Sequence, residues 1–364
     1  MRRSYVNDRF RRIRRARALL VDWRDGNLIL RNYQTQVSAS ADAEAVRFLH
    51  LLENWTRPSD LDSLLPEYTR KSIRAGLREL LGNTFVVSEG TAQAKQDAEL
   101  ASVWSDWLPQ GSFHFSTKDV EYLDPPPGLF RRYLAESPQP PLLKKYGKAR
   151  HTQLLREPTQ ESEFAQVLLA RKTHREFSGK QVPLNVISRL LYYTWGVTGR
   201  IDAPPFGSLF HKTSPSGGAR HPGEVYLLAM RVGGLAQGLY HYDGLHHTLA
   251  KLRSVPAIKK SIAYAAGQEF VGDASALFIM TAVFPRTRWK YRFARTYRVV
   301  LLETGHLCQT FCLVATWLGL APFCTAAFQD TLIEKELGLD GIRESVLYLA
   351  GVGTLPAGKV FSNR

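Results

Sequence analysis

Beyond residue 160 the chain alternates apolar stretches of helical period with shorter stretches rich in β-branched and aromatic residues. The helical stretches lie at 164–170, 184–195 and 299–319, and the strand-like ones lie at 224–232, 238–242, 275–284 and 345–351. This order predicts an α+β domain built on a largely antiparallel or mixed sheet. None of these strands is followed by a GxGxxG motif, which disfavours a Rossmann dinucleotide fold.

The first 90 residues show a pattern of their own. Apolar runs at 19–23 and 28–30 flank Asp25-Gly26, a dipeptide typical of hairpin turns. Helical stretches follow at 43–55, 59–65 and 69–81, and a strand-like stretch lies at 84–87. A hairpin, three helices and a closing strand predict a small winged-helix domain over residues 1–90.

The last of these helical stretches leaves the role of the domain open. Opposite its apolar face it carries a basic stripe made of Arg70, Lys71, Arg74 and Arg78. Such a stripe suits a DNA-reading helix, and it equally suits a solvated surface. A third alternative is that the domain captures a peptide by pairing it with a sheet edge.

Residues 91–160 read as a connecting region. Proline tracts at 125–127 and 137–141 favour extended chain, while Trp104, Trp107, Phe113 and their neighbours would be poorly placed in open solvent. We therefore expect an irregular strap that packs across the larger domain of residues 161–364. The catalytic part could begin near residue 100.

Charge and apolar content constrain the class of protein. With 44% hydrophobic and 22% charged residues the chain has the composition of a globular protein. Its net charge of +15 comes partly from an amino-terminal cluster made of Arg2, Arg3, Arg9, Arg11, Arg12, Arg14, Arg15 and Arg17. This cluster is typical of a solvated arm, or of a segment that binds an acidic peptide, a partner protein or nucleic acid.

The apolar runs do not suggest export or a membrane span. The run at 18–21 is too short for a signal peptide, and the run at 299–320 is interrupted by Glu303, His306 and Gln309. We expect a cytoplasmic protein without membrane contact.

The cysteines are few. The chain has three, Cys308, Cys312 and Cys324, which provide neither a disulfide framework nor a paired CxxC spacing for zinc. We expect them to be core thiols, and we predict no metal site.

Two short motifs carry the chemistry. Residues 171–177 bring together the guanidinium groups of Arg171 and Arg175 and the hydroxyl of Thr173, which are the donors that a phosphate requires. Residues 214–222 form a loop of small residues whose backbone can lie against a flat ring. Together the motifs predict bound flavin mononucleotide, FMN.

Read in order, the motifs resemble the nitroreductase superfamily and, within it, the SagB-type dehydrogenases that oxidise azolines in ribosomally made peptides. The matching segments are 171–177, 214–224 with Tyr226, 238–243, Lys290-Tyr291, 303–309 and 337–341, with His114, Thr117 and Lys118 upstream. Several ordered motifs make this resemblance specific.

The resemblance implies roles for individual residues. Those that would bind FMN are Arg171, Thr173 and Arg175 at the phosphate and ribityl chain, and Pro215, Ser216, Gly217 and Gly218 at the isoalloxazine. Ala326 and Ala327 stand where the family often has a glycine-rich turn near the flavin N5. The recurrence of Glu303, His306 and Gln309 every three residues predicts a polar stripe that faces the cofactor or a partner subunit, or that makes structural hydrogen bonds. Lys290 and Tyr291 would act on the substrate.

These roles imply an FMN-dependent azoline dehydrogenase. Oxidation of an azoline removes a proton and a hydride from neighbouring carbons, so Lys290 would be the base and Tyr291 would polarise the ring or relay the proton. Lysine acts as a base when burial or a nearby cation lowers its pKa from about 10.4.

The resemblance also implies partners, and it leaves alternatives. We expect a homodimer, a precursor peptide with a leader and a cyclodehydratase partner. The alternatives are a reductase that uses NAD(P)H on dehydroamino acids or small nitro or quinone compounds, and a winged-helix DNA-binding regulator with a flavin-sensing domain. Binding to nucleic acid is the less favoured expectation.

Overall fold

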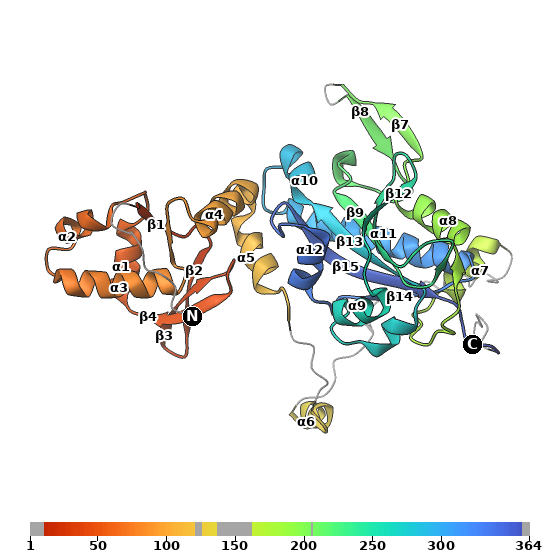
Figure 1. Ribbon diagram of the computed structural model, residues 1–364, viewed down its shortest axis with the longest axis horizontal. Coiled ribbons are helices and arrows are strands. Elements are labelled where there is room, and N and C mark those ends of the chain that lie inside the picture. Colours follow the sequence, from red (N-terminus) through yellow and green to blue (C-terminus); the bar gives the residue numbers. More distant parts are fainter. Residues whose placement is uncertain (1–10, 121–125, 137–161, 205–206, 359–364) are drawn as a thin grey trace, which may run out of the picture.

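The computed structural model describes residues 11–120, 126–136, 162–204 and 207–358. A small amino-terminal unit lies to one side of a larger unit, with the segment around residues 92–116 between them (Figure 1). The proline tract at 137–141 and the arginines Arg2, Arg3 and Arg9 lie outside the described residues.

The larger unit is built on a six-stranded sheet in the order β12-β11-β9-β13-β15-β14. The strands are β9 (Gly223–Ala229), β11 (Gly238–Asp243), β12 (Thr248–Arg253), β13 (Ala276–Val283), β14 (Ala321–Thr325) and β15 (Glu344–Gly353). Every neighbouring pair runs antiparallel. The α+β class and the antiparallel sheet are confirmed.

Helices cover both faces of this sheet. They are α7 (Glu163–Ala170), α8 (Leu184–Trp195), α9 (Ala257–Tyr264), α10 (Phe284–Lys290), α11 (Thr296–Trp317) and α12 (Asp330–Leu337). One apolar cluster joins α8 and α11 to the sheet, and a second joins α9 and α12 to its other face. The central strand β13 is therefore apolar on both faces, as a doubly covered strand must be.

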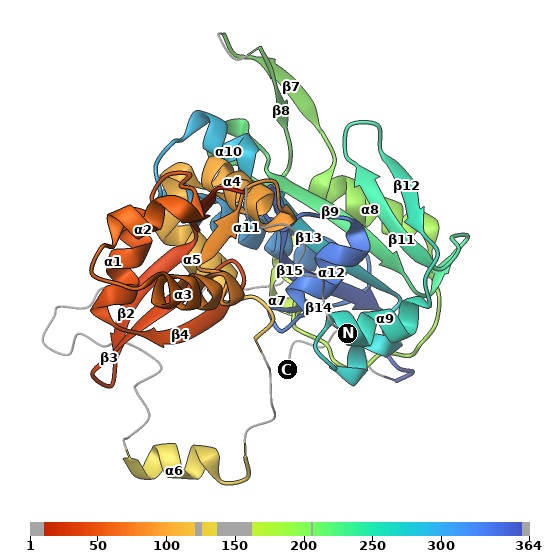
Figure 2. The ribbon, with the colours of Figure 1, turned by 60° about the vertical axis from the view of Figure 1, so that its left-hand side comes forward.

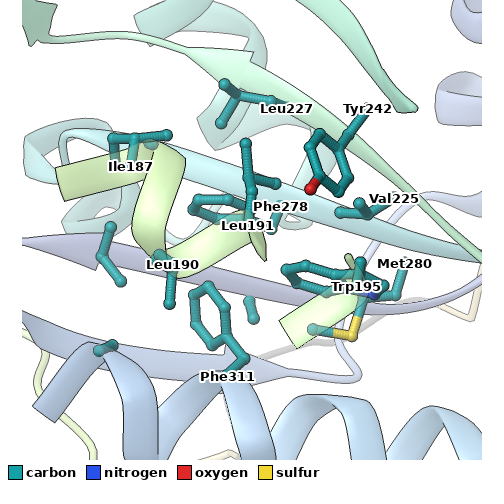
Figure 3. Close-up of a cluster of buried hydrophobic side chains, with 14 of the residues drawn as sticks. Ile187, Leu190, Leu191, Trp195, Val225, Leu227, Tyr242, Phe278, Met280 and Phe311 are labelled. Carbon is teal, nitrogen blue, oxygen red and sulfur yellow. The ribbon is translucent and has the colours of Figure 1, made fainter. Parts of the chain in front are cut away.

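The cluster under α8 and α11 fixes how these helices sit on the sheet. Phe278 of β13 stacks on Trp195 of α8 with ring centroids 6.0 Å apart, and it meets Phe311 of α11 edge-on at 4.9 Å (Figure 3). The neighbouring residues Leu277 and Ile279 point to the opposite face because side chains alternate along a strand.

By length and composition, α11 is the one helix in the described part of the chain that could cross a membrane. Half of its apolar window is buried inside the protein, where Leu307, Phe311 and Ala315 belong to the core. In this structure α11 is a core helix of the larger unit.

Smaller elements complete the larger unit. The strands β6 (Val182–Pro183) and β10 (Val232–Gly233) pair in parallel, and β7 (Gly199–Asp202) and β8 (Ser208–His211) form a hairpin. This hairpin stands out from the body of the protein in both views (Figures 1 and 2). Two short 3-10 helices, η3 (Gly217–Ala219) and η4 (Glu269–Asp273), follow β8 and α9 in the chain.

The small unit contains the expected hairpin. Strands β2 (Leu19–Arg24), β3 (Asn27–Asn32) and β4 (Val37–Ala41) form one antiparallel sheet, and Asp25-Gly26 turns between the first two with φ of 49° and 78°. The helices are α1 (Ala43–Leu51), η1 (Pro58–Asp60), α2 (Leu61–Leu64) and α3 (Arg70–Gly82). The closing strand β5 (Val86–Ser88) pairs with β1 (Ile13–Arg15) rather than with the hairpin. The result is a mixed unit of helices and two small sheets.

In its described residues, 91–120 and 126–136, the connecting region differs from the irregular strap that its composition predicted. It forms α4 (Ala92–Val103), η2 (Ser105–Trp107), α5 (Leu108–Ser116) and α6 (Leu129–Glu136). Thr91 starts α4 because its hydroxyl accepts the Ala94 N–H, a standard helix cap. The region does pack against the larger unit: Trp104 Nε1 donates to Ile342 O at 3.0 Å, and the buried Lys118 Nζ lies 2.7 Å from Glu334 Oε1.

Part of the amino-terminal arginine cluster is structural. Arg14 is buried and pairs with the buried Asp97 of α4 at 2.6 Å, while Arg12 and Arg15 pair with Glu89 and Glu53 near the surface. Arg14 therefore links the small unit to the connecting helices and does not belong to a solvated arm.

Candidate active site

The loop at 214–218 is anchored along α11. Ser214 Oγ lies 2.7 Å from Thr310 Oγ1, and the Glu303 carboxylate accepts hydrogen bonds from the Ser216 hydroxyl and the Gly217 N–H. Ser216 Oγ also accepts the His221 N–H at 2.8 Å. These bonds hold the loop in one position against the helix.

Lys290 and Tyr291 converge on this loop. They stand at the end of α10, and a Cβ built at Gly218 would collide with Tyr291 Oη and lie 2.9 Å from Lys290 Nζ. Gly218 also has a φ of 63°, which favours glycine. The structure thus brings together two motifs that are more than 70 residues apart in the sequence.

Glu303 is a titratable group in this site. Burial raises its pKa from 4.5 to about 7, against the opposing effects of the Ser216 hydroxyl, the charge of Lys212 and the Gly217 N–H. Burial in turn lowers the pKa of Lys212. The sequence analysis did not single out Lys212, because a lone lysine after a short strand gives no signal.

The raised pKa of Glu303 predicts a pH-dependent stability. Between pH 4.5 and pH 7 the folded protein keeps a proton on Glu303 that the unfolded chain has lost, so the free energy of unfolding falls as pH rises through this window. From pH 5.5 to pH 8 the loss should amount to roughly 2 kcal/mol. The free energy of unfolding, measured with denaturant at pH 5.5 and at pH 8, should show this loss in the wild type. Glu303→Gln should not show it. Equal pH dependence in the two proteins would contradict the assignment.

The arginine motif runs beside β14. Arg171 caps α7, the His174 N–H donates to Pro322 O at 2.9 Å, and the Ser178 N–H donates to Thr354 O at 2.9 Å. Between these anchors Thr173 and Arg175 are exposed, and the Arg175 guanidinium lies 6.0 Å from the centre of the Phe270 ring. Fixed backbone with outward hydroxyl and guanidinium donors suits a phosphate.

The turn after β14 lies at the carboxyl end of this strand, and the arginine motif runs beside the same strand. Ala327 N–H donates to Thr325 Oγ1 at 3.1 Å, and Gln268 Nε2 donates to Ala327 O at 3.0 Å. Ala326 stands between Thr325 and Ala327 in this turn, and Gln309 is exposed on α11 next to Thr310. Gln309, Ala326 and Ala327 thus lie on the two elements, α11 and β14, that border the other motifs.

The motifs form two groups spaced along α11. Glu303 holds the loop of Ser216 and Gly217, while Cys312 lies close enough to Arg171 to interact with its charge. Cys312 lies nine positions beyond Glu303 on the helix, which is about 13.5 Å along the axis. A cofactor that bridges both groups must therefore be elongated, with an anionic end and a flat end.

The residues present fit FMN by this criterion. The half-buried Arg171 and the exposed Thr173 and Arg175 stand at one end, and at the other a glycine backbone is held against a lysine and a tyrosine. Beside that end, a cavity of about 260 Å³ lies between β8, η3 and α10, with Phe210, Arg220 and Trp289 in its wall. Arg220 covers the Trp289 ring at 5.5 Å.

The fold is that of an α+β oxidoreductase. Residues 168–354, just over half of the chain, match the model of the nitroreductase family, and the chain belongs to this family. Members of the family typically bind FMN.

Three curated proteins are similar to parts of this chain. It is 32% identical to the nitroreductase-family protein MJ1384 of Methanocaldococcus jannaschii over 53% of this chain and 92% of that protein. It is 31% identical to the trifolitoxin-processing protein TfxB of Rhizobium leguminosarum bv. trifolii over 46% of each chain. It is 29% identical to the microcin B17-processing protein McbC of Escherichia coli over 38% of this chain and 52% of McbC. The chain thus spans about half the length of TfxB and McbC.

A solved structure shows the same fold. A chain of the Escherichia coli microcin synthetase McbBCD complex with truncated pro-MccB17 bound superposes with a TM-score of 0.54 at 20% identity. The match covers 74% of this chain and 99% of that chain, so the likeness extends beyond the family domain. The resemblance to peptide-processing members of the nitroreductase family is confirmed.

Proposed function

We propose that this protein is an FMN-dependent dehydrogenase that oxidises azolines to thiazoles or oxazoles in a ribosomally synthesised peptide, in the cytoplasm. The observation that carries the proposal is the convergence of Lys290 and Tyr291 on Gly218 of the small-residue loop. The relationship to TfxB and McbC, both processing proteins of peptide products, supports the substrate class.

The residues have distinct tasks in this reaction. Arg171, Thr173 and Arg175 would bind the FMN phosphate, and the backbone at Gly217 and Gly218 would lie against its ring. When bound, FMN would supply the acceptor for the substrate hydride, and dioxygen would be the final electron acceptor.

The proton leaves the substrate through this chain's own side chains. Lys290 would take it at Nζ from the ring carbon next to the one that loses the hydride. Tyr291, whose ring lies 5.5 Å from Lys290 Nζ, would hydrogen-bond the azoline nitrogen through Oη and polarise the ring. Phe210, Arg220 and Trp289 of the neighbouring cavity would bind the flanking peptide and exclude water.

The small unit contributes a groove for the leader of the precursor. Strand β4 is at the edge of its sheet, and a groove of about 420 Å³ lies between β4, α1 and α3. Ala39, Phe48, Ile73 and Leu80 are among the apolar residues in its wall. An open strand edge beside an apolar groove is the arrangement that binds a peptide as an added strand. This role fits the winged-helix, leader-recognition-like domain that we propose for residues 1–90.

The groove favours a peptide over DNA. Asp42, Glu44 and Glu79 also line it, and their charges would repel phosphate groups. On the basic stripe of α3, Arg70 is paired with Asp62 at 2.9 Å. These acidic neighbours reduce the positive potential that nucleic acid would need.

Filling the groove should block leader binding. Gly76 of α3 lines the groove, and a Cβ there would meet nothing within 4 Å, so Gly76→Phe places a ring in open space. We expect affinity for the leader peptide to fall roughly tenfold or more, without loss of helix stability. Fluorescence anisotropy with a labelled leader peptide measures this affinity. Gly82→Phe, also in open space on α3 but outside the groove, is the matched control and should bind normally.

A homodimer and a cyclodehydratase are the partners that we propose. Large apolar side chains are exposed on α7 and α11, namely Phe164, Leu168, Leu169, Leu301, Leu302 and Trp317. The two helices contact each other, so these residues suit one interface with a second subunit. An interface along α11 would also lie next to both groups of residues that we propose to bind FMN, the arginine motif and the loop at 214–218. The cyclodehydratase would supply the azoline substrate.

The proposal is tested by mass. Purified protein with FMN and an already cyclised precursor should remove two hydrogens from each azoline, as measured by mass spectrometry of the peptide. NAD(P)H should not be required, because the azoline itself is the electron donor. An unchanged peptide mass, or turnover that depends on NAD(P)H and adds hydrogens, would favour the reductase instead.

A further inference from the structure

The three cysteines of the chain meet at one place. Cys308 and Cys312 lie one helical turn apart on the buried face of α11, and Cys324 comes from β14, which packs against that helix. Their three Sγ atoms all lie within 4.8 Å of one another. The sequence analysis expected core thiols and no metal site, because the cysteines provide neither a disulfide framework nor a paired CxxC spacing.

The spacing of the sulfurs suits a single metal ion better than a disulfide. Zinc–thiolate bonds are about 2.3 Å long, which places sulfurs around one tetrahedral ion about 3.8 Å apart. Small rotations about the cysteine side chains would bring the three sulfurs to that spacing. A disulfide would use two of the sulfurs at about 2.05 Å and leave the third without a role.

The ligands sit on rigid elements. The spacing Cys308-x3-Cys312 directs two side chains from one face of α11, as in other helical zinc ligands, and the third comes from the sheet that this face covers. Cys308 and Cys312 are 4% and 6% exposed, whereas Cys324 is only partly buried. The Cys324 side therefore provides the path for the ion and for a water as fourth ligand.

The charges around the cluster balance for a divalent ion. The guanidinium of Arg171 lies near enough to Cys312 and Cys324 to interact with them electrostatically. Three thiolates, one Zn²⁺ and one guanidinium sum to zero charge, whereas a monovalent ion leaves an uncompensated negative charge in an apolar core. Tyr348 Oη donates to Cys324 Sγ at 3.3 Å and would orient this ligand from outside the metal shell.

We propose that Cys308, Cys312 and Cys324 form a zinc site that ties α11 to β14. Binding converts three thiols into thiolates and releases three protons, with no change of oxidation state. The ion would fix the strand that leads to Ala326 and Ala327 and the position of Arg171. The three ligands take no part in the proposed reaction, and the one residue common to both is Arg171, which is also proposed to bind the FMN phosphate.

Metal analysis of the full-length protein tests the site. Protein produced with zinc and freed of unbound metal should retain one Zn²⁺ per chain, measured by elemental mass spectrometry, with or without flavin. Cys324→Ser should lose this zinc. Tyr348→Phe keeps all three sulfurs and should bind zinc about tenfold more weakly. Because serine variants can fail to fold, titration of the wild type with Co²⁺ provides a second measurement, and a thiolate-to-cobalt absorption band should saturate at one equivalent.

Two results would overturn the proposal. One is a wild-type protein that retains no more zinc than Cys324→Ser and shows no thiolate-to-cobalt band. The other is a mass two hydrogens lower that reverts with a thiol reductant, since a disulfide from Cys324 would mean that the cluster is a redox pair and not a metal site.

Discussion

Lys290→Ala should lower the rate of azoline oxidation by a factor of about 10² to 10⁴, the contribution of a general base. The lysine lies against the loop at Gly218 and outside the arginine motif, so FMN should remain bound. In this variant the hydride acceptor FMN would still be present, but no side chain would remove the proton from the substrate ring. Single-turnover mass measurement gives the rate, and the visible spectrum gives the flavin content.

The control for this variant is Arg292→Ala. It removes one positive charge two residues away, on an exposed side chain that lies outside the residues proposed to act in catalysis. We expect it to retain the wild-type rate. Full activity in Lys290→Ala would show that Lys290 is not the base. An equal loss in both variants would show that the local positive charge matters instead.

Gly218→Ala should reduce oxidation about a hundredfold, because displacement of catalytic groups by about 1 Å has an effect of this size. The added methyl group would collide with Tyr291 Oη and press on Lys290 Nζ. The positive φ of Gly218 adds a backbone cost of about 1–2 kcal/mol. Turnover and denaturant unfolding of the same preparation separate the two effects.

Gly90→Ala is the matched control for Gly218→Ala. Gly90 has a φ of 79°, and a Cβ there would meet nothing within 4 Å, so this variant reproduces the backbone cost without the collision. It should be destabilised to a similar extent and retain the wild-type rate. Similar loss of rate in both variants would mean that general destabilisation explains the effect at Gly218.

Patterns of neighbouring residues predicted those elements whose conformation depends mainly on neighbouring residues. The helix at 184–195 has the bounds of α8, because its apolar residues recur with helical period against the sheet. The hairpin at Asp25-Gly26 formed as expected, since both residues tolerate the positive φ that the turn needs. In contrast, β4 has the sequence Val-Ser-Ala-Ser-Ala, whose small side chains carry weak strand preference, so only its pairing with β3 defines it.

The connecting region illustrates a second limit. Prolines and scattered aromatic residues suggested irregular chain, yet residues 92–116 are mostly helical because Trp104 and Trp107 are fully buried in an aromatic cluster with Phe284 and Tyr297. That cluster joins residues almost 200 positions apart, and a pattern read along the sequence does not contain such contacts.

The sequence by itself determined the α+β class, with a largely antiparallel or mixed sheet, and the order of motifs that resembles the nitroreductase superfamily, because periodicity and short motifs depend on neighbouring residues. Only the tertiary structure decided which side chains meet. It placed Lys290 and Tyr291 on Gly218, buried Glu303 beneath the loop, opened the groove beside β4 and brought Cys324 to Cys308 and Cys312. The physical reason is that close packing of α11 on the sheet fixes these distances, and packing depends on the shape of the whole core.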